Sequence, residues 1–297
     1  MNPTAVLDRM LNGRLDERAR EWLEREKDGN SAPTEFCLGF AKASRYMPGQ
    51  ALSPTAGEQE LAEQALPGWN PERWTTLEAV RARLLMARSE TASATLTDTV
   101  AECFRYADQG ELVALYRSLP LLPDGRRFLW RAGEGCRSNM SVVFDAMACD
   151  NPYPFVHFDD TAWHQLVIKA VFIDAPLWRV HGLDRRLSEE LAHMALDLAD
   201  ERRSAGRLVP PQLWLCLGSH GGRRALDALS AELTRTEPVA RAAAALGLAR
   251  AGRSELVAAA LAGERDARTT ATMEQACKGR GEQGLFATLG PTAGPLD

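Results

Sequence analysis

The sequence has few of the features that mark secreted, membrane-spanning or nucleic-acid-binding proteins. Its six cysteines are scattered and form no C-x-x-C pair, so we expect the reduced, buried thiols of a cytosolic protein. The N-terminal segment lacks the apolar core of a secretory signal, and no apolar run is long enough to span a membrane, which predicts a cytoplasmic location. The 35 Lys and Arg against 40 Asp and Glu leave a net charge of −5, which disfavours nucleic acid as a partner.

Motifs for nucleotides, metals and nucleophilic catalysis are also missing. The sequence contains neither Gly-x-Gly-x-x-Gly nor a Walker motif, so no cofactor is predicted. His157, Asp159 and His164 have the chemistry of metal ligands, but their spacing matches no established motif, and Asp159 or Asp160 is expected to cap a helix. We therefore predict no metal site and assign no nucleophile.

What the sequence does contain is helical periodicity. Of the 297 residues 45% are hydrophobic and 25% charged, a mix that can bury a large core. Apolar residues recur with a period of 3.6 residues in many segments, and one such stripe from Cys136 to Met147 predicts a single helix. Thr75 with Glu78, and Asp108 with Glu111, are spaced as capping boxes at helix starts. Since no segment alternates convincingly with period two, an all-α fold is predicted.

The C-terminal third suggests stacked helical hairpins. From about residue 222 the composition shifts towards Ala, Arg and Leu, and residues 237–247 resemble the second helix of a HEAT-like repeat, with a weaker echo about 29 residues further on. Most of the arginines in this region, at positions 241, 250, 253, 265 and 268, are expected on a solvated face. We predict a helical domain over 1–218, HEAT-like repeats over 219–278 packed on it in an α-α superhelix, and a flexible tail over 279–297.

Several segments together resemble the EboA family, and the similarity covers roughly two thirds of the chain. The segments are Pro67–Pro71, Gly110–Tyr116, Gly135–Met140, Asn151–Pro154, Phe158–Asp160, Ala162–Trp163, Leu166–Lys169, Gly182–Arg186 and Val209–Trp214. His164 and His181 depart from the family pattern, in which an amide is usual, so neither is expected to be a family-wide catalyst.

The resemblance implies a pathway rather than a reaction. Members of the family are encoded in bacterial clusters beside a prenyltransferase-like membrane protein, a sugar-isomerase-like barrel, a metal hydrolase and a dehydroquinate-synthase-like enzyme. Such clusters make or export secondary metabolites. The partners implied are proteins or intermediates of that pathway, and no catalytic residue of the family is carried over to this sequence.

Seven polar residues in or next to these segments are candidate ligand-binding groups. They are Arg137, Asn139, Asn151, His164, Lys169, Asp184 and Arg186. Lys169 lies among apolar neighbours and either binds an anionic substrate or forms a Schiff base, or else reaches solvent or pairs internally with Asp184 or Glu134.

The arginines and the asparagine leave similar alternatives open. Arg185 and Arg186 either clamp an anion or bridge neighbouring acids. Arg137 and Asn139 are two residues apart and would meet one ligand only if a turn or helix start lay there. Asn139 is more simply explained by a structural network.

Two functions follow from these observations. The first is a helical adaptor that binds a partner protein or an intermediate of a metabolite pathway and catalyses no reaction, as suits a helical solenoid. The second is an enzyme or carrier acting on a small anionic or prenylated metabolite, with Lys169, Arg137, Asp184 and Arg186 around an apolar pocket. A deep cavity where these side chains converge would favour the second, and internal bonding of the polar side chains would favour the first.

Overall fold

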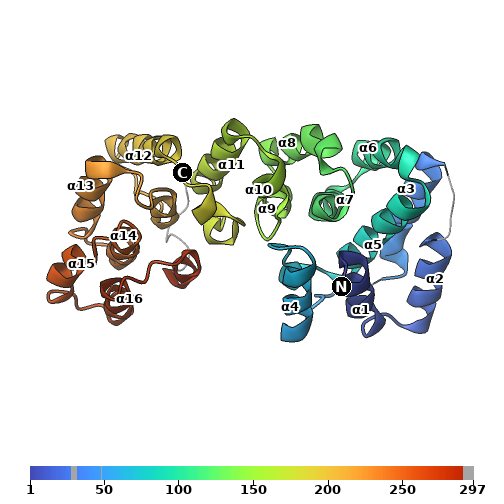
Figure 1. Ribbon diagram of the computed structural model, residues 1–297, viewed down its shortest axis with the longest axis horizontal. Helices are drawn as coiled ribbons and strands as arrows, with labels where there is room; N and C mark the ends of the chain where they lie inside the picture. The colour runs from blue at the N-terminus through green and yellow to red at the C-terminus, as the bar shows by residue number, and fades with distance from the viewer. Residues whose placement is uncertain (28–31, 48, 290–297) are drawn as a thin grey trace. The chain divides into compact units, whose positions relative to one another are not determined.

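The computed structural model describes residues 1–27, 32–47 and 49–289. Within these ranges the regular elements are all helices, and the one β-type pairing is an isolated bridge between Ala51 and Thr75 (Figure 1). The all-α prediction is therefore confirmed. Over the same ranges, no helix combines the length and the hydropathy needed to cross a membrane.

The chain divides into two compact units, Met1–Asp159 and Asp160–Asp297. The α-helices of the first unit are α1 (Pro3–Asn12), α2 (Glu17–Lys27), α3 (Pro33–Lys42), α4 (Ala56–Ala65), α5 (Thr76–Thr91), α6 (Leu96–Tyr106), α7 (Gln109–Ser118), α8 (Leu129–Arg137), α9 (Ser141–Ala148) and α10 (Tyr153–His157). Short 3-10 turns join them at η1 (Ala43–Arg45), η2 (Pro71–Arg73), η3 (Ser93–Thr95), η4 (Leu119–Leu121) and η5 (Gly125–Phe128).

Helix α5 forms the centre of the first unit. It contacts α1, α2 and α7, and every residue of its segment 79–88 is buried. Its first turn is closed by the predicted capping box, in which Thr75 and Glu78 each accept a hydrogen bond from the other's backbone N–H. The Asp108 and Glu111 box at the start of α7 is confirmed in the same way. Local sequence thus fixes where these two helices begin.

The predicted single helix from Cys136 to Met147 is wrong, because the chain turns between α8 and α9. Ser138 ends α8, and its hydroxyl accepts a hydrogen bond from the backbone N–H of Met140 at 3.1 Å. Met140, in an extended conformation, then caps α9 and is 42% exposed. A serine that bonds its own neighbouring backbone competes with helix continuation, which explains the break.

The second unit is also built from helices. Its elements are α11 (Asp160–Phe172), η6 (Leu177–Arg179), η7 (Leu183–Arg185), α12 (Glu189–Ser204), η8 (Pro211–Cys216), α13 (Gly222–Glu232), α14 (Pro238–Arg250), α15 (Ser254–Leu261), α16 (Ala267–Cys277) and η9 (Gln283–Leu289).

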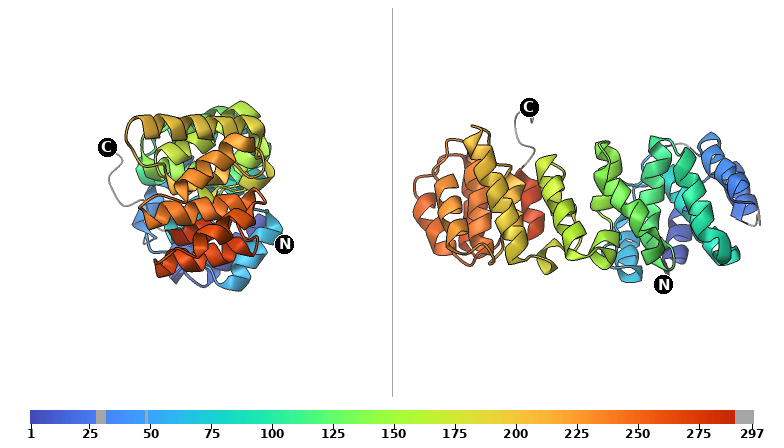
Figure 2. Two further views of the ribbon diagram at one scale, coloured as in Figure 1. Left: turned by 90° about the vertical axis from the view of Figure 1, so that its left-hand side faces the viewer. Right: turned by 90° about the horizontal axis from the view of Figure 1, so that it is seen from above.

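Helices α13 to α16 form two consecutive hairpins whose second helices pack together. Figure 1 shows α13 and α15 on one side and α14 and α16 on the other, and Figure 2 shows the same group from two further directions. Helix α14 contacts α13, α15, α16 and η8. Its first residue, Pro238, and the first residue of α16, Ala267, are 29 residues apart, which is the spacing of the sequence echo.

The C-terminal stretch 279–297 was predicted to be a flexible tail. Within it, residues 283–289 form η9, in which Phe286 and Leu289 are buried. Element η9 contacts α14, η6 and η8, and the side-chain amide of Gln283 donates to the carbonyl of Val180 at 2.8 Å. Residues 290–297 of the predicted tail lie outside the described residues.

Candidate functional site

The candidate ligand-binding residues belong to both units. Arg137, Asn139 and Asn151 lie in the first unit, and the remaining four lie in the second.

Asn151 is a buried member of a hydrogen-bond network. Its side-chain amide donates to the carbonyl oxygens of Tyr116 and Ala146, at 3.1 and 2.9 Å. Its side-chain oxygen accepts from the backbone N–H of Tyr153 at 3.0 Å. The residue is 3% exposed, and both the nitrogen and the oxygen of its side-chain amide are hydrogen-bonded to backbone groups. These bonds give Asn151 a structural role in the first unit.

Arg137 and Asn139 lie on either side of Ser138, at the turn between α8 and α9, and both are exposed. The turn that a shared ligand would require is therefore present. The guanidinium of Arg137 is 3.9 Å from the carboxylate of Glu134, one turn earlier on α8. An ion pair at this distance contributes little to stability, because the Arg137 side chain is 68% exposed. The same exposure leaves this turn accessible for binding.

His164 is buried on α11 and faces the start of α12. Its Nε2 atom is 3.1 Å from the hydroxyl oxygen of Ser188, and its Nδ1 atom is 3.7 Å from the carboxylate of Glu190. The Ser188 hydroxyl also accepts the backbone N–H of Leu191 at 3.1 Å, which makes it the N-cap of α12. This cap accounts for the serine as a structural residue.

Arg186 forms an ion pair at the surface of the second unit, whereas Lys169 is half-buried on α11. The guanidinium of Arg186 is 2.7 Å from the carboxylate of Asp160 and lies 4.7 Å above the ring of Trp163. It therefore bridges a neighbouring acid, which was one of the two alternatives for this residue. Lys169 is half-buried on α11, five residues after His164 and so about 140° round the helix from it.

Asp184 pairs with an arginine from the C-terminal region. Its carboxylate accepts a hydrogen bond from Arg250, whose guanidinium also donates to the carbonyl oxygens of Gly281 at 2.9 Å and Leu215 at 3.3 Å. The pair lies in an open groove of about 400 Å³ that also includes Ser219 and His220. Sequence reasoning proposed Asp184 but missed Arg250, because the two are 66 residues apart.

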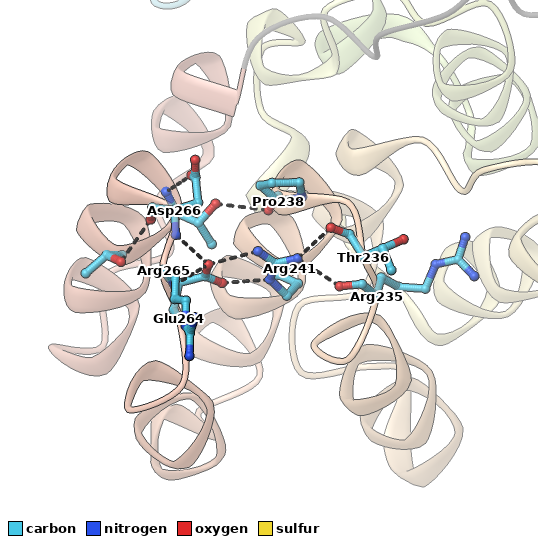
Figure 3. A network of polar contacts seen from close by, with 9 residues as sticks. Arg235, Thr236, Pro238, Arg241, Glu264, Arg265 and Asp266 are labelled. Atoms are coloured by element: carbon cyan, nitrogen blue, oxygen red, sulfur yellow. Dashed lines mark hydrogen bonds and ion pairs between the residues drawn. The ribbon is translucent and has the colours of Figure 1, made fainter.

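Two of the five C-terminal arginines lie apart from the solvated face that was predicted for most of them. The Arg250 side chain is 7% exposed and the Arg241 side chain 18%. Arg241 donates two hydrogen bonds to the carboxylate of Glu264, at 2.6 and 2.8 Å, and two more to the carbonyl oxygens of Arg235 and Thr236, both at 2.8 Å (Figure 3). This guanidinium therefore ties the turn before α14 to the turn before α16.

The carboxylate of Glu264 is strongly held in this network. It also accepts the backbone N–H groups of Arg265 and Asp266, each at 2.9 Å (Figure 3). The hydrogen bond from Arg241, followed by these backbone bonds, lowers the pKa of Glu264 to about 2. The acid is therefore ionised at neutral pH, and Arg241 is its counter-ion.

A groove of about 690 Å³ lies beside this network, between α13 and α15. Its walls carry small or apolar side chains, among them Leu233, Leu256 and Ala259, and Met273 of α16 also lines it. Arg265 contributes an exposed cation to the same groove. The sequence did not reveal this groove, although the apolar composition of α15 was a signal for it. In the structure Val257 is the one buried residue of this helix.

The described residues contain no group of three or more His, Cys, Asp and Glu side chains placed to hold a metal ion.

Comparison with known proteins identifies the family. The sequence matches the family described as "Metabolite traffic protein EboA" over residues 4–218, which is more than half of the chain. The chain belongs to the EboA family. No curated protein and no solved structure matches it significantly. The EboA match ends inside the second unit, just after η8, so the groove between α13 and α15 lies beyond the matched residues.

Proposed function

We propose that this EboA protein is a cytoplasmic helical adaptor that binds a partner protein of a bacterial secondary-metabolite pathway and catalyses no reaction. The family description, metabolite traffic, supports the pathway. The observation that carries the proposal is the internal bonding of three of the seven candidate polar residues. Asn151 is satisfied by backbone groups, Asp184 is held by Arg250, and Arg186 bridges Asp160. Groups that recognise a substrate would instead converge on a pocket.

The groove between α13 and α15 is the surface we assign to the partner. We interpret the two hairpins α13–α14 and α15–α16 as HEAT-like repeats, an architecture that exposes extended binding surfaces. The groove is open and bordered by small side chains such as Ser230, Ala260 and Gly263, which permit a backbone to approach closely. Because Arg241 neutralises Glu264, the exposed Arg265 leaves a net positive charge there. The occupant we expect is an apolar helical segment with an acidic residue opposite Arg265.

The test is capture of pathway proteins from a host that carries the gene cluster, compared among three forms of the chain. We expect the unchanged chain to retain a partner protein, Ala259→Arg to lose it, and Ala258→Arg to keep it. Both alanines are exposed on α15, but only Ala259 lines the groove. Arg265→Glu should weaken capture at least about tenfold, because it reverses the charge that faces the acidic residue. Equal capture by Ala259→Arg and the unchanged chain would show that the groove is not the binding surface.

The competing proposal is an enzyme or carrier for a small anionic or prenylated metabolite. It is tested by mass spectrometry of small molecules that co-purify with the native protein, and by assaying any such compound for turnover. Loss of turnover in a folded Lys169→Ala variant would overturn the adaptor proposal and assign the reaction to α11. Retention of a metabolite by the unchanged chain and by Lys169→Ala alike would favour a carrier whose site lies elsewhere.

A further inference from the structure

Two cysteines that are far apart in sequence meet between α3 and α6. Cys37 lies on α3 and Cys103 on α6, and these helices pack along one another in the first unit. Their Sγ atoms are 2.8 Å apart, and both residues are free thiols. A covalent S–S bond is about 2.05 Å long, so the two sulfurs need to approach by less than about 1 Å to form one.

The two thiols differ in their access to solvent. Cys37 is half-buried, whereas Cys103 is 4% exposed. The hydrogen bond from the Cys103 thiol lowers the pKa of Cys37, against the opposing effects of burial and of the nearby carboxylates of Glu102 and Glu111. The same contact, together with burial, raises the pKa of Cys103. Cys37 is therefore the more accessible of the two thiols and the one that loses its proton more readily, and Cys103 is placed to react second.

We propose that Cys37 and Cys103 form an oxidation site at which a peroxide converts the two thiols reversibly into an intramolecular disulfide. The Cys37 thiolate attacks one oxygen of hydrogen peroxide, which breaks the O–O bond, forms a sulfenic acid and releases one water after proton uptake. The Cys103 sulfur then attacks the Cys37 sulfur, and the sulfenic oxygen leaves with the Cys103 proton as a second water. Two thiols are oxidised by two electrons, and one peroxide is reduced to two waters.

The disulfide would join α3 covalently to α6. It closes a chain segment that contains all of α4 and α5 as well as both cysteines, and long loops of this kind lose the most conformational freedom in the unfolded state. Oxidation is therefore expected to stabilise the first unit and to restrict any movement of α3 against α6. The proposal concerns the first unit and does not depend on the adaptor function.

The test uses the full-length chain, reduced and then exposed to hydrogen peroxide before the remaining thiols are alkylated. Trypsin cuts after Lys27, Lys42, Arg88 and Arg105, which places Cys37 in peptide 28–42 and Cys103 in peptide 89–105. We expect these two peptides to be recovered as one species that lacks two hydrogens and separates again on reduction. We also expect oxidation to raise the Tm of the chain by at least about 5 °C.

Variants separate this site from general cysteine oxidation. Cys37→Ser and Cys103→Ser should each abolish the joined peptides and the rise in Tm, whereas Cys277→Ser, which changes a half-buried cysteine on α16, should change neither. The peptide map of the unchanged chain decides the matter even if a variant folds poorly. Recovery of Cys37 as sulfinic acid with Cys103 still reduced, or of either cysteine joined to a different one, would overturn the proposal.

Discussion

At the scale of single residues, a substitution at Asn151 distinguishes a structural role of this side chain from a role in ligand binding. Replacing it by alanine leaves the carbonyl oxygen of Ala146 and the N–H of Tyr153 without their Asn151 partner in a buried place. The carbonyl oxygen of Tyr116, in contrast, still accepts the backbone N–H of Leu119. Unsatisfied buried groups cost about 1–3 kcal/mol each, so we expect Asn151→Ala to lower the free energy of unfolding by about 3 kcal/mol. Urea denaturation followed by circular dichroism measures this loss.

Asn139→Ala is the matched control, because Asn139 is exposed at the α8–α9 turn. Its effect on stability should stay within about 0.5 kcal/mol. If Asn151→Ala were as stable as the unchanged chain but failed to capture the partner, Asn151 would be a binding residue and its buried bonds would be incidental.

The sequence identified several residues that form hydrogen bonds or ion pairs in the structure. It identified the partner of such a residue only where the two were close in the chain. The capping partners Thr75 and Glu78 are three residues apart, and their bonds follow from helix geometry alone. Asp184 and Arg250 are joined by the way the second unit folds, and a single sequence carries no signal for that pairing. For the same reason the sequence did not show that Arg241 departs from the solvated face predicted for most of these arginines, since its counter-ion Glu264 comes from a later turn.

At the scale of elements, the start of α4 is held to the end of α1 by an ion pair whose strength depends on pH. Arg14 donates to both oxygens of the Glu58 carboxylate, at 3.0 and 2.7 Å, and Glu58 also closes the capping box with Thr55. The Arg14 hydrogen bond, opposed by burial and assisted by the Thr55 backbone, lowers the pKa of Glu58 to about 2.

A pKa lowered by folding stabilises the protein where the acid is ionised. The contribution of Glu58 is therefore complete above about pH 4.5 and disappears as the pH falls towards 2. It amounts to at most about 3 kcal/mol, and to less where solvent screens the pair. Urea titrations at pH 7 and pH 3 should show that Glu58→Gln removes part of the acid sensitivity of the first unit. Identical pH dependence in the variant and the unchanged chain would contradict this assignment.

The close packing of α14 rests on a glycine in its middle. A Cβ atom added to Gly247 would lie 2.7 Å from a methyl carbon of Leu229 on α13 and 3.3 Å from the Cβ atom of Trp214 in η8. Alanine favours a helix by about 1 kcal/mol over glycine, but Leu229 is fully buried and has little space to move. We therefore expect Gly247→Ala to lower the Tm by several degrees in calorimetry.

Gly110→Ala in α7 is the comparison for this prediction. The nearest atom to an added Cβ there is 3.5 Å away, an ordinary contact, so we expect a neutral or slightly stabilising effect. A Tm for Gly247→Ala equal to or above that of the unchanged chain would mean that α13 and α14 can separate without cost.

The sequence predicted most helices of the chain but not every boundary between them. The stripe from Cys136 to Met147 continues with helical spacing across the turn at Ser138, so periodicity alone could not show the break. Helix α4 was not predicted, although Thr55 and Glu58 are spaced as a capping box at its start. The helix-ending serine at position 138 and the helix-starting pair Thr55 and Glu58 would have corrected both predictions.

At the scale of the whole molecule, the family match and the compact units end at different residues. The match ends at 218, whereas the contacts divide the chain after Asp159. Element η8 lies before residue 218 and packs on α14, which lies after it. Trp214 in η8 is 1% exposed and would lose the cover of α14 in a chain that ends at 218.

We therefore expect fragment 1–159 to fold on its own and to unfold cooperatively. In fragment 1–218, we expect the portion that belongs to the second unit, residues 160–218, not to fold cooperatively. Hydrogen exchange read by mass spectrometry distinguishes the two: peptides covering η8 should be protected in the full chain and should exchange at nearly the unprotected rate in 1–218. Dye binding to exposed apolar surface should rise for 1–218 but not for 1–159. If η8 kept its protection in 1–218, the end of the EboA match would be a folding boundary, and α13 to α16 would be a separable addition to the family's domain.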